Sequence, residues 1–286
     1  MSERVKIILD KNADILRLPA IALRGLVVFP GNIIHFEVGR KKSIAAIEWA
    51  MSNNNAVFLT AQQDMDVEDP GFKDLYAYGV VAEVKQVLRV SDELVKVLVE
   101  GKYRAKLLTL DSSGRFLLAS TKAAALRGTK SVDSARVEAL VRSVKEAFEE
   151  YLSLNPRLSK DVVYTIITNE DAALLCDYIP ANLLLKYTDK QALLNEGTVS
   201  GRLEKLLEIL RRETKILHIE KDIQSKVNEQ MDKNQRDYYL REQMRAISNE
   251  LDDFDDTREE AEEYKAKIEK TKLPEEAREK LLKEAD

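Results

Sequence analysis

The chain has 286 residues, of which 44% are hydrophobic and 33% charged, a composition typical of a globular protein with roughly two domains. Its formal net charge is −5 and the acidic excess lies in the last third, above all in residues 252–263, so no basic face is visible and we expect no nucleic-acid partner. One cysteine excludes an internal disulfide, no apolar run approaches the about 18 residues of a membrane span, and the amino terminus is too polar for a signal peptide, so we expect a cytoplasmic protein without membrane contact.

Residues 1–124 predict a β-rich head. Short apolar or alternating segments cover residues 16–23, 33–38, 56–61, 78–90 and 94–110, with residues 115–121 closing the set and a helix inserted at residues 41–53. The tripeptide Ser91-Asp92-Glu93 marks the clearest hairpin. Several short strands with little helix favour a small, strongly bent sheet or pseudo-barrel.

One apolar run in the head, formed by Leu26, Val27, Val28 and Phe29, stops at the turn signal Pro30-Gly31. We predict that these four residues bind substrate, because an apolar edge of a small sheet can accept an extended peptide by strand addition or apolar contact. The alternative interpretation places all four side chains in the core.

Residues 125–199 predict a helical bundle. Val137, Leu140, Val144 and Phe148 follow a helical period that ends before Asn155-Pro156. Shorter helices are expected at about residues 160–167, 170–178 with Asn169 as cap, 181–187 and 189–195. Helices joined by such short loops stay together, so we expect the bundle to hold the base of the helix that follows.

Residues 200–253 predict a very long interdomain helix, because the segment Arg202–Asp253 contains neither Gly nor Pro. If continuous it extends roughly 78 Å at 1.5 Å per residue, far beyond a typical globular helix. Its apolar stripe is thin and drifts around the helix, which disfavours a long regular two-stranded coiled coil. We interpret it as a strut between domains that self-associates through Met231–Leu251; the alternative is a solvated surface helix.

Residues 254–286 predict a helical lead-in to a further module. Thr257 and Glu260 have the spacing of a capping box that opens a new helix, and Pro274 precedes a last one. Leu281 and Leu282 form an apolar edge with nothing after it to cover it, so we expect the natural chain to continue.

No motif points to an active site. A phosphate-binding loop needs G-x-x-x-x-G-K followed by Ser or Thr, and the single Gly-Lys pair, Gly101-Lys102, lacks the upstream Gly. His35, Cys176 and His218 are too scattered for a zinc site, and Cys176 lies in an apolar run typical of a buried side chain. We therefore predict no catalytic residue, no metal and no cofactor in this chain.

Four segments carry a family resemblance: IALRGLVVFPG at residues 21–31, VGRKKSIAAIE at 38–48, DLYAYGVVAEVKQ at 74–86 and EKDIQSKVNEQMDKNQRDYYLREQMRAI at 220–247. The core of the last, QRDYYLREQ, is the most specific. Together they resemble the amino-terminal region of the Lon family of ATP-dependent proteases over nearly the whole chain.

The resemblance implies an α+β fold, in which a PUA-like β pseudo-barrel head is followed by a helical bundle and a very long helix. It also implies a parent protein with a hexameric AAA+ motor and a Ser–Lys protease that degrades misfolded and regulatory proteins. This chain lacks Walker A, Walker B and the Ser–Lys dyad, so ATP, Mg and catalysis are expected in the missing module.

We therefore expect a region for substrate recognition and hexamer organisation, whose partners are unfolded or damaged proteins and copies of itself. The expected assembly residues on the long helix are Met231, Arg236, Tyr238, Tyr239, Arg241 and Met244. The alternative function is a non-catalytic adaptor that binds a folded partner and dimerises through the long helix.

Overall fold

The computed structural model describes residues 15–91, 93–127, 134–155 and 158–284, and for residues 134, 249–259, 276, 282 and 283 it describes the backbone alone. Asp92 of the predicted hairpin and Pro156 of the predicted helix stop lie outside the described residues. The chain divides into two units, residues 1–218 and 219–286, with the boundary inside a helix. The architecture is α+β, as expected.

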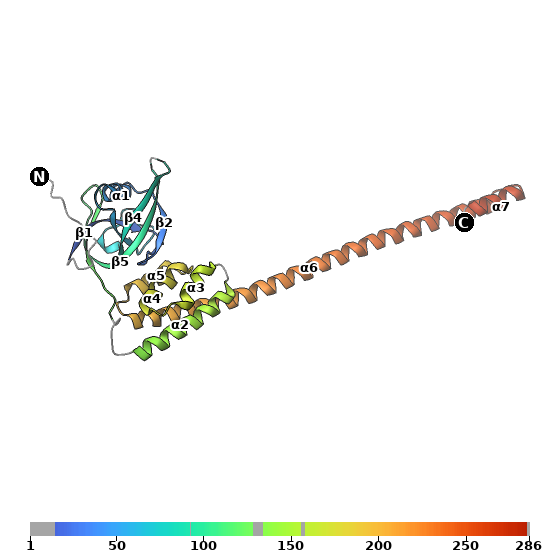
Figure 1. Ribbon diagram of the computed structural model, residues 1–286. Coiled ribbons are helices and arrows are strands. Elements are labelled where there is room, and N and C mark those ends of the chain that lie inside the picture. The colour runs from blue at the N-terminus through green and yellow to red at the C-terminus, as the bar shows by residue number, and fades with distance from the viewer. Residues whose placement is uncertain (1–14, 92, 128–133, 156–157, 285–286) are drawn as a thin grey trace. The chain divides into compact units, whose positions relative to one another are not determined.

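The first unit begins with a sheet of six described strands, shown in blue and green in Figure 1. Their bounds are β1 (Leu16–Leu23), β2 (Ile33–Val38), β3 (Ala56–Ala61), β4 (Tyr78–Arg89), β5 (Val95–Asp111) and β6 (Leu117–Ala123), with a 3-10 turn, η1 (Phe72–Asp74), before β4. Because β6 pairs with both β1 and β5, the strands β5, β4, β3, β1 and β6 form a closed ring. This ring confirms the predicted pseudo-barrel.

β2 is added to the outside of this ring through the first half of β5, from Ile33 opposite Glu100 to Val38 opposite Val95. β1 and β3 run parallel, and the other pairings are antiparallel. The expected inserted helix is α1 (Lys41–Asn53), which packs Ile47 and its neighbouring alanines against the sheet. Its bounds agree with the helix predicted at residues 41–53.

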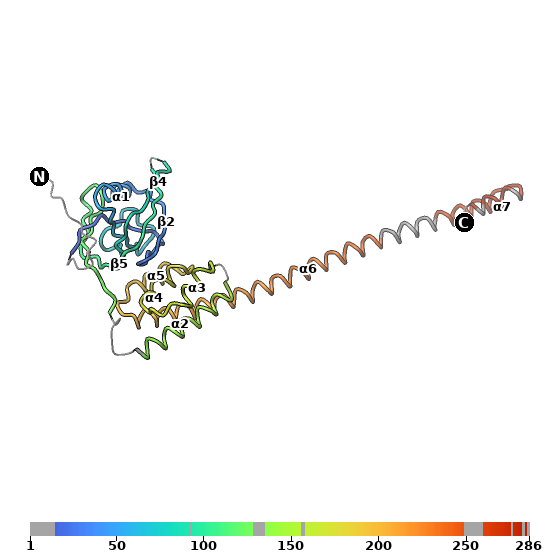
Figure 2. The backbone as a smooth tube through the Cα atoms, viewed as in Figure 1, coloured from blue at the N-terminus to red at the C-terminus, as the bar shows by residue number. Residues whose placement is uncertain are grey.

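Four helices follow the sheet, namely α2 (Ser134–Leu154), α3 (Lys160–Thr168), α4 (Ala172–Asn182) and α5 (Tyr187–Asn195) (Figure 2). Their apolar side chains share one core with the sheet and with the first turns of the next helix. The α4 cap is Asp171, which accepts hydrogen bonds from the N–H groups of Ala173 and Leu174, and not Asn169 as predicted.

The helix predicted at residues 181–187 is absent. In its place, α4 ends at Asn182 and an extended segment leads to α5. Leu183 and Leu185 are buried while Leu184 between them is 75% exposed, which is the two-residue alternation of an extended chain and not a helical period. Three consecutive leucines concealed this alternation in the sequence.

The long helix is α6 (Val199–Lys270), and its 72 residues correspond to about 108 Å. The break predicted near residues 254–257 is wrong, because Thr257 lies inside α6. No Gly or Pro occurs between Arg202 and Lys270, so nothing in the backbone ends the helix. A final helix, α7 (Glu275–Glu284), begins directly after Pro274, as expected.

Within the first unit α6 is firmly packed. Leu203, Leu206 and Leu210 are fully buried, and the Thr198 hydroxyl caps the helix by accepting a hydrogen bond of 3.2 Å from the Gly201 N–H. In the second unit every side chain from Ile219 to Ser248 is exposed. None of the described helices is both long enough and apolar enough to cross a membrane.

Candidate functional site

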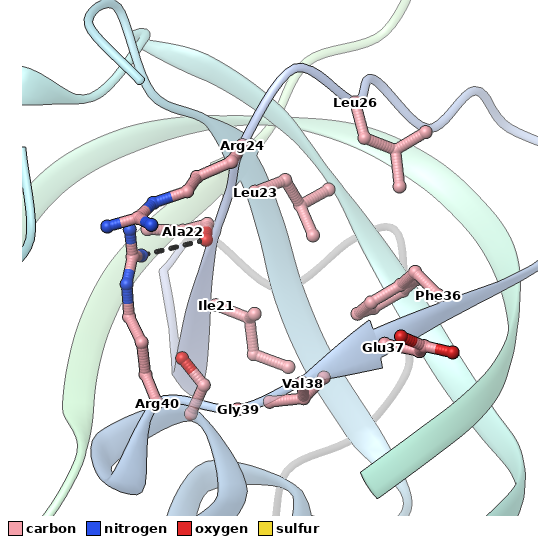
Figure 3. Close-up of a pocket in the computed structure, with 11 residues that line it drawn as sticks. Ile21, Ala22, Leu23, Arg24, Leu26, Phe36, Glu37, Val38, Gly39 and Arg40 are labelled. Atoms are coloured by element: carbon pink, nitrogen blue, oxygen red, sulfur yellow. Dashed lines mark hydrogen bonds between the residues drawn. The ribbon is translucent and has the colours of Figure 1, made fainter. Parts of the chain in front are cut away.

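A pocket of about 360 Å³ opens between β1 and β2 (Figure 3). Its walls are the end of β1 with the residues that follow, and the end of β2 with the first turn of α1. In the described sheet β1 pairs with β3 and β6, whereas β2 pairs with β5 alone, so no backbone pairing joins β1 to β2. The pocket therefore lies where two strand edges come close without being joined.

The interior of this pocket is apolar. Ile21, Leu23 and Val38 form its buried floor, and the half-buried Leu26 and Phe36 stand over it. Figure 3 shows Ile21, Leu23, Leu26 and Phe36 pointing into the same space. Ligand pockets commonly have such an apolar lining with a few polar groups at fixed positions.

One side of the pocket carries two arginines. Arg40 donates from Nη1 to the Ala22 carbonyl oxygen at 3.2 Å and from Nη2 to Gln62 Oε1 at 2.5 Å, while Arg24 Nη2 donates to the Val67 carbonyl oxygen at 3.3 Å. Burial, and then the neighbouring Arg24 charge, lower the pKa of Arg40. Among the described residues, no carboxylate lies within 4.0 Å of either guanidinium. The negative charges of Asp69 and Glu68, which line a neighbouring hollow together with both arginines, oppose this lowering of the Arg40 pKa.

A buried amide holds Arg40 in this position. Gln62 is fully buried, and its Nε2 donates to the carbonyl oxygens of Asp64 and Val67 at 3.1 and 2.9 Å. Its backbone N–H donates to the Leu23 carbonyl oxygen at 2.9 Å, which ties β3 to the end of β1. The side-chain oxygen that remains accepts from Arg40. Since both polar atoms of the Gln62 side chain and its backbone N–H are used, the arginine is fixed by the fold.

The amino terminus of α1 adds a third electropositive feature to the same rim. Its N-cap is Arg40, no side chain caps the first N–H groups, and the first turn contains no acid. Ser43 in this turn is 5% exposed, lines the pocket and forms no hydrogen bond to any described residue through its hydroxyl. Lys42 is engaged elsewhere, in an ion pair with Asp69 at 2.9 Å.

A second hollow of about 690 Å³ lies between the β1–β2 turn and α4. Its wall includes Asp177, whose Oδ1 is 2.5 Å from Nη1 of Arg202. Burial raises the pKa of Asp177, and the adjacent Arg202 opposes that rise. This ion pair belongs to the packing at the base of α6, because Arg202 is only 1% exposed.

The structure places the predicted substrate segment mostly inside the protein. Val27, Val28 and Phe29 are buried in the core, as the alternative interpretation held, and have no surface to offer a ligand. Leu26 alone reaches the pocket. Substrate contact by Leu26 therefore stays a prediction.

The predicted assembly residues lie on α6 in the second unit. All six side chains are exposed, and they are Met231, Arg236, Tyr238, Tyr239, Arg241 and Met244. Tyr239 accepts a hydrogen bond from Gln243 Nε2 at 3.1 Å within the same helix. Exposure makes these side chains available to a partner, and their role in assembly stays a prediction.

No described group of acidic, His or Cys side chains has the arrangement of a metal site. Cys176 is fully buried, and burial raises the pKa of its thiol to about 12. The thiol is therefore protonated at neutral pH, a state that does not suit a nucleophile.

Sequence reasoning missed Arg24, Arg40, Ser43 and Gln62 as a group. They come from three places in the chain, and only the fold brings Arg24, Arg40 and Ser43 to one pocket with Gln62 behind them. The basic run Arg40-Lys41-Lys42 at the start of a predicted helix was the one available signal. Positive charges are unfavourable at a helix amino terminus, so basic residues there suggest contacts outside the helix.

Comparison with known proteins agrees with this architecture. The family model described as ATP-dependent protease La (LON) substrate-binding domain matches residues 17–212. The solved N-terminal domain of a Mycobacterium avium complex Lon protease superposes with a TM-score of 0.56 at 20% identity, covering 68% of this chain and 98% of that one. At that identity the likeness shows the fold alone.

Relatives of known sequence are more similar. The Lon protease of Heliobacterium modesticaldum is 39% identical over 286 residues, which is 100% of this chain and 34% of that protein. The Lon protease of Escherichia coli K12 is 39% identical over 270 residues, covering 94% of this chain and 34% of that protein. The chain thus spans about a third of the length of the curated relatives it matches, and the predicted family resemblance is confirmed. This chain belongs to the family of Lon substrate-binding domains.

Proposed function

We propose that this chain is the substrate-recognition region of an ATP-dependent Lon protease and that it binds apolar segments of unfolded or damaged proteins in the β1–β2 pocket. The observation that carries the proposal is the apolar pocket itself, in a chain that belongs to this family. Leu26 and Phe36 are half-buried there beside two strand edges that are not joined.

The chemistry of the pocket suits selection by folding state. Burying one large apolar side chain contributes about 1.5–3 kcal/mol, so a single contact is weak. A native protein keeps its large apolar side chains inside and presents few of them, whereas an unfolded chain presents many. Weak binding to exposed apolar side chains therefore distinguishes an unfolded protein from a native one without recognition of a particular sequence.

A direct test compares one polypeptide in its two states. Reduced, carboxamidomethylated lysozyme cannot refold, and native lysozyme has the same chain. Fluorescence anisotropy of each labelled form, titrated with the 286-residue chain, is expected to show binding of the unfolded form only. Equal binding of both forms, or binding of the native form alone, would contradict the proposal.

The rest of the activity belongs to the parent protein. We propose that the parent is a cytoplasmic hexamer that uses ATP and Mg in a motor outside these residues and cleaves with a separate protease module. Within this chain, residues 1–124 select substrate, residues 125–199 hold the base of the long helix, residues 200–253 connect, and residues 254–286 lead into the motor. The chain alone is then expected to hydrolyse neither ATP nor casein.

Self-association through α6 is supported by the arrangement of its exposed apolar residues. At about 100° per residue, one group falls within a sector of about 120°: Ile219, Ile223, Val227, Met231 and Tyr238. A second group lies farther along the helix, in an adjacent sector of about 60° that begins about 20° from the first: Leu240, Met244 and Ile247. A ring needs two different surfaces on each subunit, because its interfaces are head-to-tail.

The same exposed apolar residues favour a second candidate function, a non-catalytic adaptor that dimerises through α6 and binds one folded partner. A two-fold dimer uses a single self-complementary surface, unlike a ring. The lysozyme comparison distinguishes the two candidate functions, because an adaptor for a folded partner is not expected to bind unfolded lysozyme.

A further inference from the structure

β2 is the one strand of the described sheet that has a whole edge without a partner strand. The other five strands close into the ring, whereas β2 pairs with β5 on one side and with no strand on the other. The pairing with β5 is regular over all six residues, from Ile33 to Val38. No backbone hydrogen bond between described residues reaches β2 from its outer side. A row of backbone N–H and C=O groups is therefore open along this edge.

The hydrogen bonds to β5 indicate which groups of β2 point outward. In an antiparallel pair every second residue bonds to the partner strand, and the residues between direct their N–H and C=O groups away from it. The Gly101 N–H donates to the carbonyl oxygen of Asn32, directly before β2 begins, at 2.9 Å. Counted from Asn32 in the observed register, the outward groups belong to Ile33, His35 and Glu37.

This edge lacks the usual protection against pairing with another chain. Edge strands of soluble proteins are commonly protected by proline, by lysine or by a bulge. β2 contains no Pro and no Lys, and no bulge interrupts its pairing with β5. On the opposite side of the pocket the edge of β1 is occupied, because Arg40 Nη1 donates to the Ala22 carbonyl oxygen at 3.2 Å (Figure 3). Of the two strand edges beside the pocket, β2 is the one with open backbone groups.

The apolar pocket lies along this open edge. Phe36 and Val38, two residues apart on one face of β2, line the pocket, and Leu26 stands across from them. Side chains of a strand alternate between the two faces of its sheet. A strand added to β2 would thus place every second side chain over the pocket, against Leu26 and Phe36. Backbone pairing and apolar contact are available to one extended chain at the same time.

Resting on the function proposed above, we propose that an extended segment of an unfolded protein binds as an additional strand on the outer edge of β2, with every second side chain in the β1–β2 pocket. In this mode of recognition main-chain hydrogen bonds supply affinity and the alternate side chains supply selectivity. The pattern that binds is then apolar residues at alternate positions, and not a particular sequence.

An unfolded segment suits this edge better than a second copy of the chain. It presents free backbone groups and free apolar side chains together. In a second copy, the inner face of β2 already packs against its own core through Ile34, Phe36 and Val38. The copy would therefore bring the backbone of an edge strand but no apolar side chains for the pocket.

The test uses the 286-residue chain and a fluorescein-labelled peptide, Ser-Leu-Ser-Phe-Ser-Leu-Ser, which alternates polar and apolar residues. Two N-methylated forms are compared with it, one methylated on the three apolar residues and the other on the last three serines. On a bound strand the N–H groups of one set face β2 and those of the other set face away. Anisotropy titrations are expected to show about tenfold weaker binding of one methylated form and an affinity within about twofold of the unmethylated peptide for the other.

A substitution on β2 tests the same edge from the side of the protein. His35→Pro removes an outward N–H group and leaves the hydrogen bonds to β5, a position at which an edge strand tolerates proline. It is expected to weaken binding of the unmethylated peptide about tenfold. The control, Ser112→Pro, introduces the same residue at an exposed position directly after β5 and should leave the affinity unchanged. Trp49 fluorescence checks that both variants are folded, and the methylated peptides decide the matter in the unaltered chain if His35→Pro is not.

Equal affinity of the unaltered chain for the two methylated forms would overturn strand addition, as would full affinity of folded His35→Pro. Absence of peptide binding would overturn it too, and self-association that His35→Pro abolishes would then identify a second copy as the occupant of β2. Unfolded lysozyme separates these failures from a failure of the proposed function. If it still binds, only strand addition is wrong. If it does not bind but the difference between the methylated peptides persists, strand addition stands and the broader function is wrong.

Discussion

Arg202 is the residue on which the base of α6 most depends. It is 1% exposed and pairs with Asp177, and it also donates to the carbonyl oxygens of Leu194 and Glu196 at 3.3 and 3.0 Å. The partners lie on α4 and at the end of α5, so a single side chain joins both helices to α6. A buried charge that loses its partner is costly, whereas an exposed pair contributes little.

Arg202→Met is therefore expected to lower the free energy of unfolding by about 3 kcal/mol, because it leaves the Asp177 carboxyl group buried and unpaired. Urea unfolding followed by Trp49 fluorescence measures the change. Arg212→Met is the control on the same helix, since Arg212 is 45% exposed in its pair with Asp189. That variant is expected to cost less than about 1 kcal/mol, and equal effects would contradict the assignment.

Glu196 gives the same region a dependence on pH. Its carboxylate accepts from Lys205 Nζ at 3.1 Å and from Thr198 Oγ1 at 3.0 Å, and these contacts lower its pKa from 4.5 to about 2. Because the pKa is lower in the folded chain, the ionised carboxylate stabilises the fold above about 4.5, and this stabilisation is lost as the pH falls toward 2.

Comparing the unaltered chain with Glu196→Gln should show a clear difference in urea midpoint at pH 6 that shrinks at pH 3. Glu208→Gln, an exposed change on α6, should show no such pH-dependent difference. A gap for Glu196→Gln of the same size at both pH values would show that its charge does not hold the helix start.

Part of the side-chain packing at the base of α6 could be predicted from the sequence, and part could not. Leu203, Leu206 and Leu210 recur at helical spacing on one stripe of the sequence, and all three are fully buried. Arg202 looked like an ordinary first residue of a helix, because its partners Asp177 and Glu196 are distant or outside any periodic pattern. Glu208 and Arg212 have the four-residue spacing of a helical acid–base pair, but they do not join, because Arg212 reaches Asp189 of α5 at 2.6 Å instead.

At the scale of elements, a glycine explains why the predicted substrate segment is buried. The turn after Phe29 crosses β5 at Gly101, where Gly31 N–H donates to the Gly101 carbonyl oxygen at 2.8 Å. A Cβ atom on Gly101 would lie 2.2 Å from the Phe29 carbonyl oxygen. A glycine inside a strand often marks such a close approach of backbone, and this was the signal that the segment belongs to the core.

Gly101→Ala is expected to destabilise the head by about 1–3 kcal/mol or more, because the added methyl group meets backbone that cannot move aside easily. The measurement is again the urea midpoint from Trp49 fluorescence. Gly114→Ala, whose Cβ would come no nearer than 3.7 Å to Phe116, is the control and should be close to neutral. Similar stabilities of the two variants would contradict the packing described here.

Element boundaries in the head were predicted well, because turn residues such as Pro30-Gly31 and Asn54-Asn55 separate strongly patterned segments. The helix expected at residues 181–187 failed because Leu183, Leu184 and Leu185 fit either period. The predicted end of the long helix at residue 253 was wrong for a different reason. An acidic run next to Thr257 resembles a cap, but a helix continues through such a sequence when no residue breaks its backbone.

Self-association is tested on α6. The double variant Met231→Ala with Tyr238→Ala removes two exposed apolar side chains from one sector, and we expect about tenfold weaker association by sedimentation equilibrium. Asp232→Ala with Lys233→Ala changes two exposed polar residues between them and should associate normally. An unaltered chain that sediments as a monomer at every concentration would contradict assembly through this helix.

At the scale of the whole molecule, one chain combines a small barrel with a pocket, helices that anchor α6, and a long exposed helix. The pocket could not be predicted, because it depends on the closure of β5, β4, β3, β1 and β6 into a ring that leaves β2 outside. The general architecture could be predicted, because changes of hydrophobic period along the chain separate strands from helices. Together these features fit recognition of substrate in one part and connection to other modules in another.

The most direct measurement of the central claim is the affinity of reduced, carboxamidomethylated lysozyme for two variants of the chain. Leu26→Ser makes the mouth of the pocket polar, and Leu88→Ser makes the same change at an exposed leucine on β4. We expect about tenfold weaker binding for Leu26→Ser, with both variants folded by Trp49 fluorescence, and an unchanged affinity for Leu88→Ser. Undiminished binding by Leu26→Ser would contradict recognition of unfolded proteins in the β1–β2 pocket.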